Sequence, residues 1–282
     1  MSSPSLAVTG STGALGGLVA RDLAARGVAQ RLLVRSADRA PALEGAVVAV
    51  CSYGDGAAAR AALDGVETLL MVSAAENAER LQEHRTFVDA AAEAGVHHVV
   101  YTSFAGAAPD CTFTLGRDHW ATEEHLRASG LQHTFLRDNF YLDFLPLMVG
   151  EDDVIRGPAG DGRMAGVARA DVARSAVAVL LDPAAHAGTA YTMTGPEALT
   201  MTEAAAVLSE VTGRRVTFHD ETVEEAYESR QRWGAPPWQV DAWVSTYTAI
   251  RAGEVADVSD DVRRLTGRPP LSLRQILALD GA

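Results

Sequence analysis

The stretch that decides the fold lies near the start of the chain and reads LAVTGSTGALGG over residues 6–17. A short apolar run ends at Thr9, glycines follow at Gly10, Gly13 and Gly16, and an alanine-rich segment continues with helical spacing to Ala25. The pattern predicts a strand, a tight turn and a helix, in that order.

The three glycines suit a dinucleotide that lies across this turn. We expect Gly10 to let the backbone leave the strand, Gly13 to remove a side chain where a pyrophosphate comes close, and Gly16 to let the helix pack on the sheet. Free N–H groups at the helix start, together with the positive end of the helix dipole, would hold the phosphates. The alternative is an ordinary tight turn. The predicted pyrophosphate contacts are Gly10, Ser11, Thr12, Gly13, Ala14 and Leu15.

A second part of the dinucleotide site is predicted at the end of the next strand. Residues 31–35 predict the second strand, which ends in Arg35 at the position where folds that bind NAD usually carry an acidic residue. A guanidinium binds a ribose 2′-phosphate through paired, charge-assisted hydrogen bonds, whereas a carboxylate repels it. Arg35 therefore predicts a preference for NADP(H); the alternative is that it only solvates the strand end.

Strands and helices alternate along the first half of the chain. Apolar runs at 46–50, 68–73, 98–103 and 133–137 are separated by helical patterns, which predicts an α/β fold with a doubly wound parallel sheet of the Rossmann type. The pattern after these runs is irregular. We expect a NAD(P)-binding Rossmann domain over residues 1–140 and a smaller C-terminal α/β lobe over 141–282 packed on it, with the chain free to cross between the two.

Composition excludes several classes of function. A net charge of −13 disfavours binding to nucleic acid or to an anionic membrane, and the two cysteines form no metal-type pair, so we expect no metal site. No signal peptide or membrane span is evident, so we expect a cytoplasmic protein, monomeric or homodimeric. The sequence contains no lysine, which rules out Schiff-base chemistry and the Tyr-x-x-x-Lys pair of familiar short-chain dehydrogenases.

Several further motifs carry a family resemblance, which covers nearly the whole chain. The glycine motif, Val34-Arg35, Tyr101-Thr102-Ser103, His119 to Glu123 and the stretch from Phe135 to Tyr141 resemble the NmrA-like branch of the atypical short-chain dehydrogenases. Within that family the chain is most similar to the reductases of quinones and triphenylmethane dyes. The resemblance implies NADPH as cofactor and a small quinone-like molecule as hydride acceptor.

The resemblance also implies contacts beyond the glycine turn. By position, Ser73, Ala74 and Ala75 would pass beside the adenosine and ribose of the cofactor, and Asn139, Phe140 and Tyr141 would lie near the nicotinamide. Arg169 falls where relatives have an arginine close to the cofactor cleft. It could neutralise a phosphate or pair with Asp171.

To reduce a quinone, the protein needs only to orient the nicotinamide against the acceptor and to supply a proton, because the acceptor is already electrophilic. One candidate acid is the face formed by His119 and Glu123, four residues apart on one predicted helix, where the carboxylate is expected to raise the histidine pKa. The alternative is a structural pair. Tyr141 could instead donate its phenolic proton, or it could stack against the cofactor or the core.

Two functions remain open from the sequence. The first is an NADPH-dependent oxidoreductase that transfers hydride to a quinone or a similar electrophilic acceptor. The second is a non-catalytic redox sensor of the NmrA kind, which binds NADP and acts through a protein partner. The match to the reductase subgroup favours the enzyme.

Overall fold

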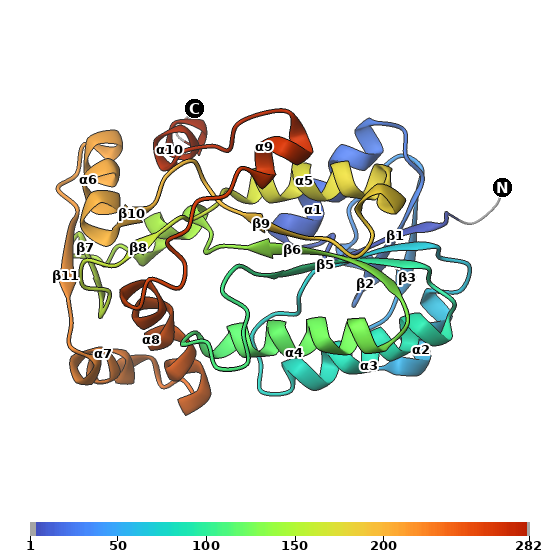
Figure 1. The fold of residues 1–282 in the computed structure, drawn as a ribbon, viewed down its shortest axis with the longest axis horizontal. Helices are drawn as coiled ribbons and strands as arrows, with labels where there is room; N and C mark the ends of the chain where they lie inside the picture. Colours follow the sequence, from blue (N-terminus) through green and yellow to red (C-terminus); the bar gives the residue numbers. More distant parts are fainter. Residues whose placement is uncertain (1–3, 281–282) are drawn as a thin grey trace. The chain divides into compact units, whose positions relative to one another are not determined.

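The computed structural model describes residues 4–280 and contains a seven-stranded sheet with the order β3-β2-β1-β4-β5-β6-β9 (Figure 1). The pairs β1·β2, β1·β4, β2·β3 and β4·β5 are parallel. Strand order reverses between β1 and β4, the place where doubly wound sheets bind ligands at the carboxyl ends of their strands. The predicted Rossmann-type α/β fold is confirmed. The strands of the sheet are β1 (Leu6–Thr9), β2 (Gln30–Val34), β3 (Ala46–Val50), β4 (Thr68–Met71), β5 (His98–Phe104), β6 (Gln132–Asp138) and β9 (Ala190–Met193).

Helices cover both faces of this sheet (Figure 1). On one face lie α2 (Gly56–Ala62), α3 (Arg80–Glu93) and α4 (Thr114–Ala128), and on the other lie α1 (Ala14–Ala25) and α5 (Arg169–Leu181). Strands covered on both faces bury nearly every side chain, and all four residues of β1 and all seven of β5 are buried.

The chain divides into two compact units, and each is built from separate segments. Within the described residues, the first unit comprises the chain up to Ser103 together with Asp118–Arg137 and Val172–Tyr191. The second comprises Phe104–Arg117, Asp138–Asp171 and the residues from Thr192 onward.

The second unit contains two small sheets and most of the late helices. Strand β7 (Val154–Gly157) pairs in parallel with β11 (Thr217–Asp220), and β8 (Arg163–Met164) pairs antiparallel with β10 (Leu199–Thr200). The remaining helices are α6 (Met201–Thr212), α7 (Val223–Arg230), α8 (Pro237–Arg251), α9 (Asp261–Thr266) and α10 (Leu273–Asp280). Short 3-10 turns occur along the whole chain: η1 (Ala37–Arg39), η2 (Leu142–Met148), η3 (Pro183–His186) and η4 (Gln231–Trp233).

No helix of residues 4–280 combines the length and apolar character that a membrane span requires. In the same residues, no group of three or more His, Cys, Asp or Glu side chains could hold a metal ion.

Candidate functional site

The turn between β1 and α1 requires glycine at two positions, for two different reasons. Gly10 has φ +65°, a backbone conformation that other residues rarely adopt. A Cβ added to Gly16 would lie 2.4 Å from the carbonyl oxygen of Gly10 and 2.6 Å from that of Thr9, closer than non-bonded atoms approach. The sharp exit from the strand and the close packing of the helix, both expected from the sequence, are confirmed.

The start of α1 leaves polar groups available to a ligand. Its N-cap, Gly13, provides no side-chain hydrogen bond, and the first turn has no acidic residue. Thr12, Gly13 and Ala14 are exposed, while the Ser11 hydroxyl is buried without a hydrogen-bond partner among residues 4–280. Unsatisfied N–H groups at a helix start, with a buried hydroxyl beside them, fit a pyrophosphate. The Leu15 side chain is buried, so this residue would contribute its backbone.

Arg35 directly follows β2 and is exposed. Within residues 4–280 its guanidinium forms no hydrogen bond or ion pair, so all of its donors remain open to a ligand. Arg39, at the end of η1, is also exposed. This environment fits a phosphate on the ribose, because a guanidinium already paired with a carboxylate would be neutralised.

The segment that follows β4, residues 72–75, is held by side chains from several elements, and we call it the β4 loop. The Val72 N–H donates to Thr9 Oγ1 over 2.8 Å, and the Tyr53 hydroxyl donates to the Val72 carbonyl over 2.6 Å. The Ser73 N–H donates to Thr102 Oγ1 over 2.8 Å. These bonds fix the path of the backbone as it leaves the sheet.

Two side chains of α3 hold the next residue of the β4 loop. The Ala74 N–H donates to His84 Nε2 over 2.8 Å, and Arg80 Nε donates to the Ala74 carbonyl over 3.0 Å. Ala74 is half-buried and Ala75 is exposed. The small residues that the sequence assigned to the cofactor therefore belong to a rigid loop, and α3 supplies part of that rigidity.

His119 is a neutral hydrogen-bond acceptor rather than an acid. Arg80 Nη2 lies 2.9 Å from His119 Nε2, and a guanidinium can only donate, so Nε2 carries no proton. The proton then sits on Nδ1, which lies 2.9 Å from the Tyr101 hydroxyl. Burial lowers the pKa of His119 well below its ordinary value, and the charge of Arg80 lowers it further. The expectation that Glu123 raises this pKa is wrong.

Glu123 binds other partners because its side chain is directed toward the sheet. The carboxylate is 0% exposed and accepts from Ser103 Oγ over 2.6 Å. Arg137 donates to both carboxylate oxygens over 2.8 and 2.6 Å, and Arg127, one helical turn on, donates over 2.9 Å. Glu123 is therefore the fully paired centre of a buried cluster that ties α4 to β5 and β6.

In the second unit, the half-buried Tyr141 is hydrogen-bonded to the buried Asp138. The Tyr141 hydroxyl donates to Asp138 Oδ2 over 2.9 Å. Burial raises the pKa of Asp138 well above its ordinary value. Burial and the neighbouring Asp138 also raise the pKa of the Tyr141 phenol. The pair sits where β6 ends, so it occupies a strand terminus of the kind at which α/β proteins place functional groups.

The two residues between this pair have structural partners. Asn139 donates from Nδ2 to the Val255 carbonyl over 3.0 Å, and its Oδ1 accepts from the Phe140 N–H over 2.8 Å. The Phe140 ring packs against Phe104 and Phe113, with centroids 5.0 and 5.1 Å away. Asn139 and Phe140 therefore fix the backbone that carries Tyr141.

Arg169 stacks on aromatic rings instead of pairing with Asp171. Its guanidinium carbon lies 5.3 Å from the ring centroid of Tyr141 and 4.2 Å from that of Phe144. Within residues 4–280 the Arg169 side chain forms no ion pair, and its backbone N–H donates to Asp143 Oδ2 over 2.9 Å. Because these rings leave the N–H groups of the guanidinium open, Arg169 can bind an anion or a carbonyl oxygen.

Sequence reasoning missed three residues with a clear place in these networks. Arg80 and His84 lie four apart at the start of the helix that follows the β4 loop, a spacing that puts both on one face near the loop. Asp138 is the last residue of its strand, three positions before Tyr141. The sequence shows the spacing of these residues, but it does not show which of them are buried or where their side chains point.

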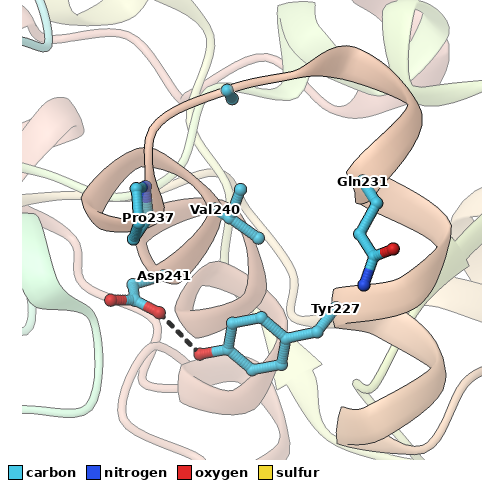
Figure 2. A pocket seen from close by; sticks show the side chains of 6 residues that line it. Tyr227, Gln231, Pro237, Val240 and Asp241 are labelled. Atoms are coloured by element: carbon cyan, nitrogen blue, oxygen red, sulfur yellow. Dashed lines mark hydrogen bonds between the residues drawn. The ribbon is translucent and has the colours of Figure 1, made fainter.

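A separate hollow of about 310 Å³ lies between α7 and α8 in the second unit (Figure 2). The Tyr227 hydroxyl donates to Asp241 Oδ1 across it over 2.8 Å. None of the predicted site residues lines this hollow, whose walls are Tyr227, Gln231, Ala235, Pro237, Val240 and Asp241.

Comparison with known proteins places this geometry in a family. The model of the NmrA-like family matches residues 2–231. The chain belongs to the NmrA-like family. Its resemblance to that family, expected from the motifs, is confirmed.

Three relatives align with this chain over nearly its full length. Quinone oxidoreductase 2 of Escherichia coli is 34% identical, with 96% of each chain covered. The crystal structure of that enzyme complexed with NADPH covers 98% of this chain and 100% of its own, with a TM-score of 0.89 and 32% identity. A (4-alkanoyl-5-oxo-2,5-dihydrofuran-3-yl)methyl phosphate reductase of Streptomyces griseus is 36% identical, covering 95% of this chain and 94% of the relative.

The third relative is the triphenylmethane reductase of Citrobacter, solved with NADP(H). It has a TM-score of 0.86 and 31% identity and covers 98% of this chain and 99% of its own. All three relatives are reductases or oxidoreductases by name, and the chain is an oxidoreductase of this family.

Proposed function

We propose that this protein is an NADPH-dependent oxidoreductase that transfers hydride to a quinone or a similarly electrophilic small molecule. The observation that carries the proposal is the open start of α1, where uncapped N–H groups adjoin the partnerless Ser11 hydroxyl. Arg35 supports the choice of NADPH over NADH, because its charge is unpaired among residues 4–280. The relatives solved with NADPH and NADP(H) support the same cofactor.

In this proposal the first unit binds the cofactor. The turn from Gly10 to Leu15 holds the pyrophosphate, Arg35 binds the 2′-phosphate, and the β4 loop, with Ser73, Ala74 and Ala75, lines the adenosine and ribose. The bound cofactor supplies the hydride. His119 and Glu123, which the sequence offered as an acid, are proposed to hold Arg80 and the end of β5, respectively.

The second unit contributes the remaining candidates. Tyr141 is the proposed proton donor to the reduced acceptor, Asn139 and Phe140 position it, and Arg169 binds a negatively charged or carbonyl oxygen of a ligand. The expected lobe over residues 141–282, with acceptor contacts of its own, stays a prediction.

The test is a titration followed by turnover. Purified protein is titrated with NADPH and NADH by nicotinamide fluorescence, and NADPH oxidation is then followed at saturating cofactor with a panel of simple quinones. We expect tighter binding of NADPH and acceptor-dependent oxidation. Binding without oxidation by any acceptor would favour a redox sensor, and failure to bind either dinucleotide would overturn the proposal.

A further inference from the structure

The carboxyl group of Asp138 is buried, and among the described residues one hydrogen-bond donor reaches it. The residue is 5% exposed, and its Oδ2 accepts from the Tyr141 hydroxyl, while its Oδ1 has no partner among residues 4–280. Glu123 shows what a buried carboxylate ordinarily requires, since two arginines and a serine bind it. Within the described part of the chain, one hydroxyl and no cation bind the Asp138 side chain, an environment that suits a neutral carboxylic acid.

We propose that Asp138 is a positioning residue that holds a proton for Tyr141, so that the Tyr141 phenol acts as the general acid toward the acceptor. This inference rests on the proposed reductase function and adds a role that the sequence did not indicate. Its geometric basis is the 2.9 Å contact between the carboxyl and the phenol, together with the partnerless Oδ1.

Protons pass from Asp138 to Tyr141 and from Tyr141 to the acceptor. When Asp138 is neutral, the direction of the 2.9 Å hydrogen bond reverses. The Asp138 Oδ2–H then donates to the Tyr141 oxygen, and the phenolic hydrogen is free to bond with an oxygen of the acceptor. After the acceptor has gained a hydride, that oxygen carries negative charge and takes the phenolic proton. Tyr141 takes the proton of Asp138 as its own O–H bond breaks. Asp138 is left as a carboxylate and regains a proton from water, so the acceptor gains two electrons and two hydrogens in all.

Two further charged groups act on the Tyr141 phenol in opposite directions. The Arg169 guanidinium lies over the Tyr141 ring and opposes the upward shift that burial imposes on the phenol pKa. Asp143 raises the phenol pKa, and its carboxylate accepts a hydrogen bond from the backbone N–H of Arg169. For Asp138 itself, burial raises the pKa and the bond from Tyr141 only partly offsets it, so the neutral form persists above the pH at which an exposed aspartate ionises.

An infrared difference spectrum tests the protonated state without cofactor or turnover. We expect the wild-type protein at pH 7 to show a carboxylic-acid C=O band that is missing from Asp138→Asn. The Tyr141→Phe variant removes the hydrogen bond but not the carboxyl, so it should shift the band rather than abolish it. This second variant keeps the test valid if Asp138→Asn folds poorly. Absence of the band in the wild type at pH 7 overturns the proposal.

Steady-state kinetics test the relay itself. We expect Asp138→Asn to lower kcat by about 10²-fold with an unchanged Kd for NADPH, and to remove the loss of kcat that the wild type shows as pH rises through the Asp138 pKa. Asp261→Asn is a matched control, since Asp261 accepts the Thr192 N–H in the same unit and should leave kcat unchanged. If none of the acceptors supports NADPH oxidation by the wild type, the function and the relay are both overturned. If the wild type is active and Asp138→Asn is equally active, the relay alone is overturned.

Discussion

Arg80 donates a hydrogen bond from Nη2 to Nε2 of His119 over 2.9 Å, and both side chains are buried. The same arginine holds the Ala74 carbonyl through Nε. Protonation of His119 at Nε2 would oppose two donors and bring two positive charges together in a buried site. His119 therefore acts as a fixed acceptor that orients Arg80 toward the β4 loop.

The buried neutral histidines predict a loss of stability in acid. His84 and His119 have lowered pKa values in the folded protein, so below about pH 6.5 the unfolded chain binds protons that the folded chain does not. The free energy of unfolding should then fall with decreasing pH, by up to about 1.4 kcal/mol per pH unit for each histidine. Urea titrations at pH 7.5, 6.0 and 5.0 measure this. His84→Gln should reduce the dependence of the unfolding free energy on pH, and His97→Gln, at an exposed position, should not. If His84→Gln and the wild type show the same pH dependence, the explanation is wrong.

Arg35→Asp should reverse the cofactor preference. Charge-assisted hydrogen bonds contribute about 1.5–3 kcal/mol each, so we expect NADPH to bind roughly 10- to 100-fold more weakly. NADH binding should hold steady or improve because its ribose 2′-hydroxyl can donate to the new carboxylate. The measurement is a pair of Kd values by fluorescence titration. Arg85→Asp changes another exposed arginine of the first unit and is the control; a similar loss in both variants would point to general electrostatics instead.

Alanine at Gly13 and at Gly16 should separate binding from folding. A Cβ on Gly13 would lie 3.3 Å from the Gly10 oxygen, a contact that small shifts relieve, whereas one on Gly16 would lie 2.4 Å from the same atom. We expect Gly16→Ala to lose about 1–3 kcal/mol of stability or more. Gly13→Ala should keep a near wild-type Tm but bind NADPH at least about tenfold more weakly, equivalent to about 1.4 kcal/mol. Full NADPH affinity in Gly13→Ala would argue against a close pyrophosphate.

Removal of the Glu123 carboxylate should destabilise the first unit. Arg137 and Arg127 would lose their shared buried partner, and breaking a buried ion pair costs about 3–5 kcal/mol. Glu123→Ala should therefore lower the midpoint of urea unfolding strongly. Glu124→Ala, at the exposed neighbouring position, should change it little. If Glu123→Ala keeps its stability and loses only turnover, the catalytic interpretation of Glu123 returns.

The fold was predictable because its signals are local. The strand expected at 98–103 is β5, His98–Phe104, and the helix predicted to carry His119 and Glu123 is α4, Thr114–Ala128. The positive φ of Gly10 follows from a sharp turn after a buried strand. Strands, helices and tight turns of this kind depend on residues that are close in the sequence, so the sequence alone predicts them.

The side-chain network was not predictable, because its partners are distant in the chain. A spacing of four places His119 and Glu123 on one helical face, yet His119 bonds to Arg80, 39 positions away, and Glu123 bonds to Ser103, 20 positions away. Hydrogen bonds from arginines decided where each side chain turned, from Arg80 for His119 and from Arg127 and Arg137 for Glu123. The Asp138–Tyr141 pair is local, but its burial, and the lack of a cation beside the carboxyl among residues 4–280, follow only from the folded structure.

The anchored β4 loop restricts how this protein can be redesigned. Its backbone bonds use Thr9 from β1, Thr102 from β5 and His84 from α3, so the anchors are scattered across the primary structure. If residues 72–75 were replaced by the equivalent loop of another oxidoreductase, the backbone N–H groups would move. The side chains that now accept their hydrogen bonds would no longer be in the right positions. Libraries that aim at altered cofactor use must therefore diversify the loop and its anchors together.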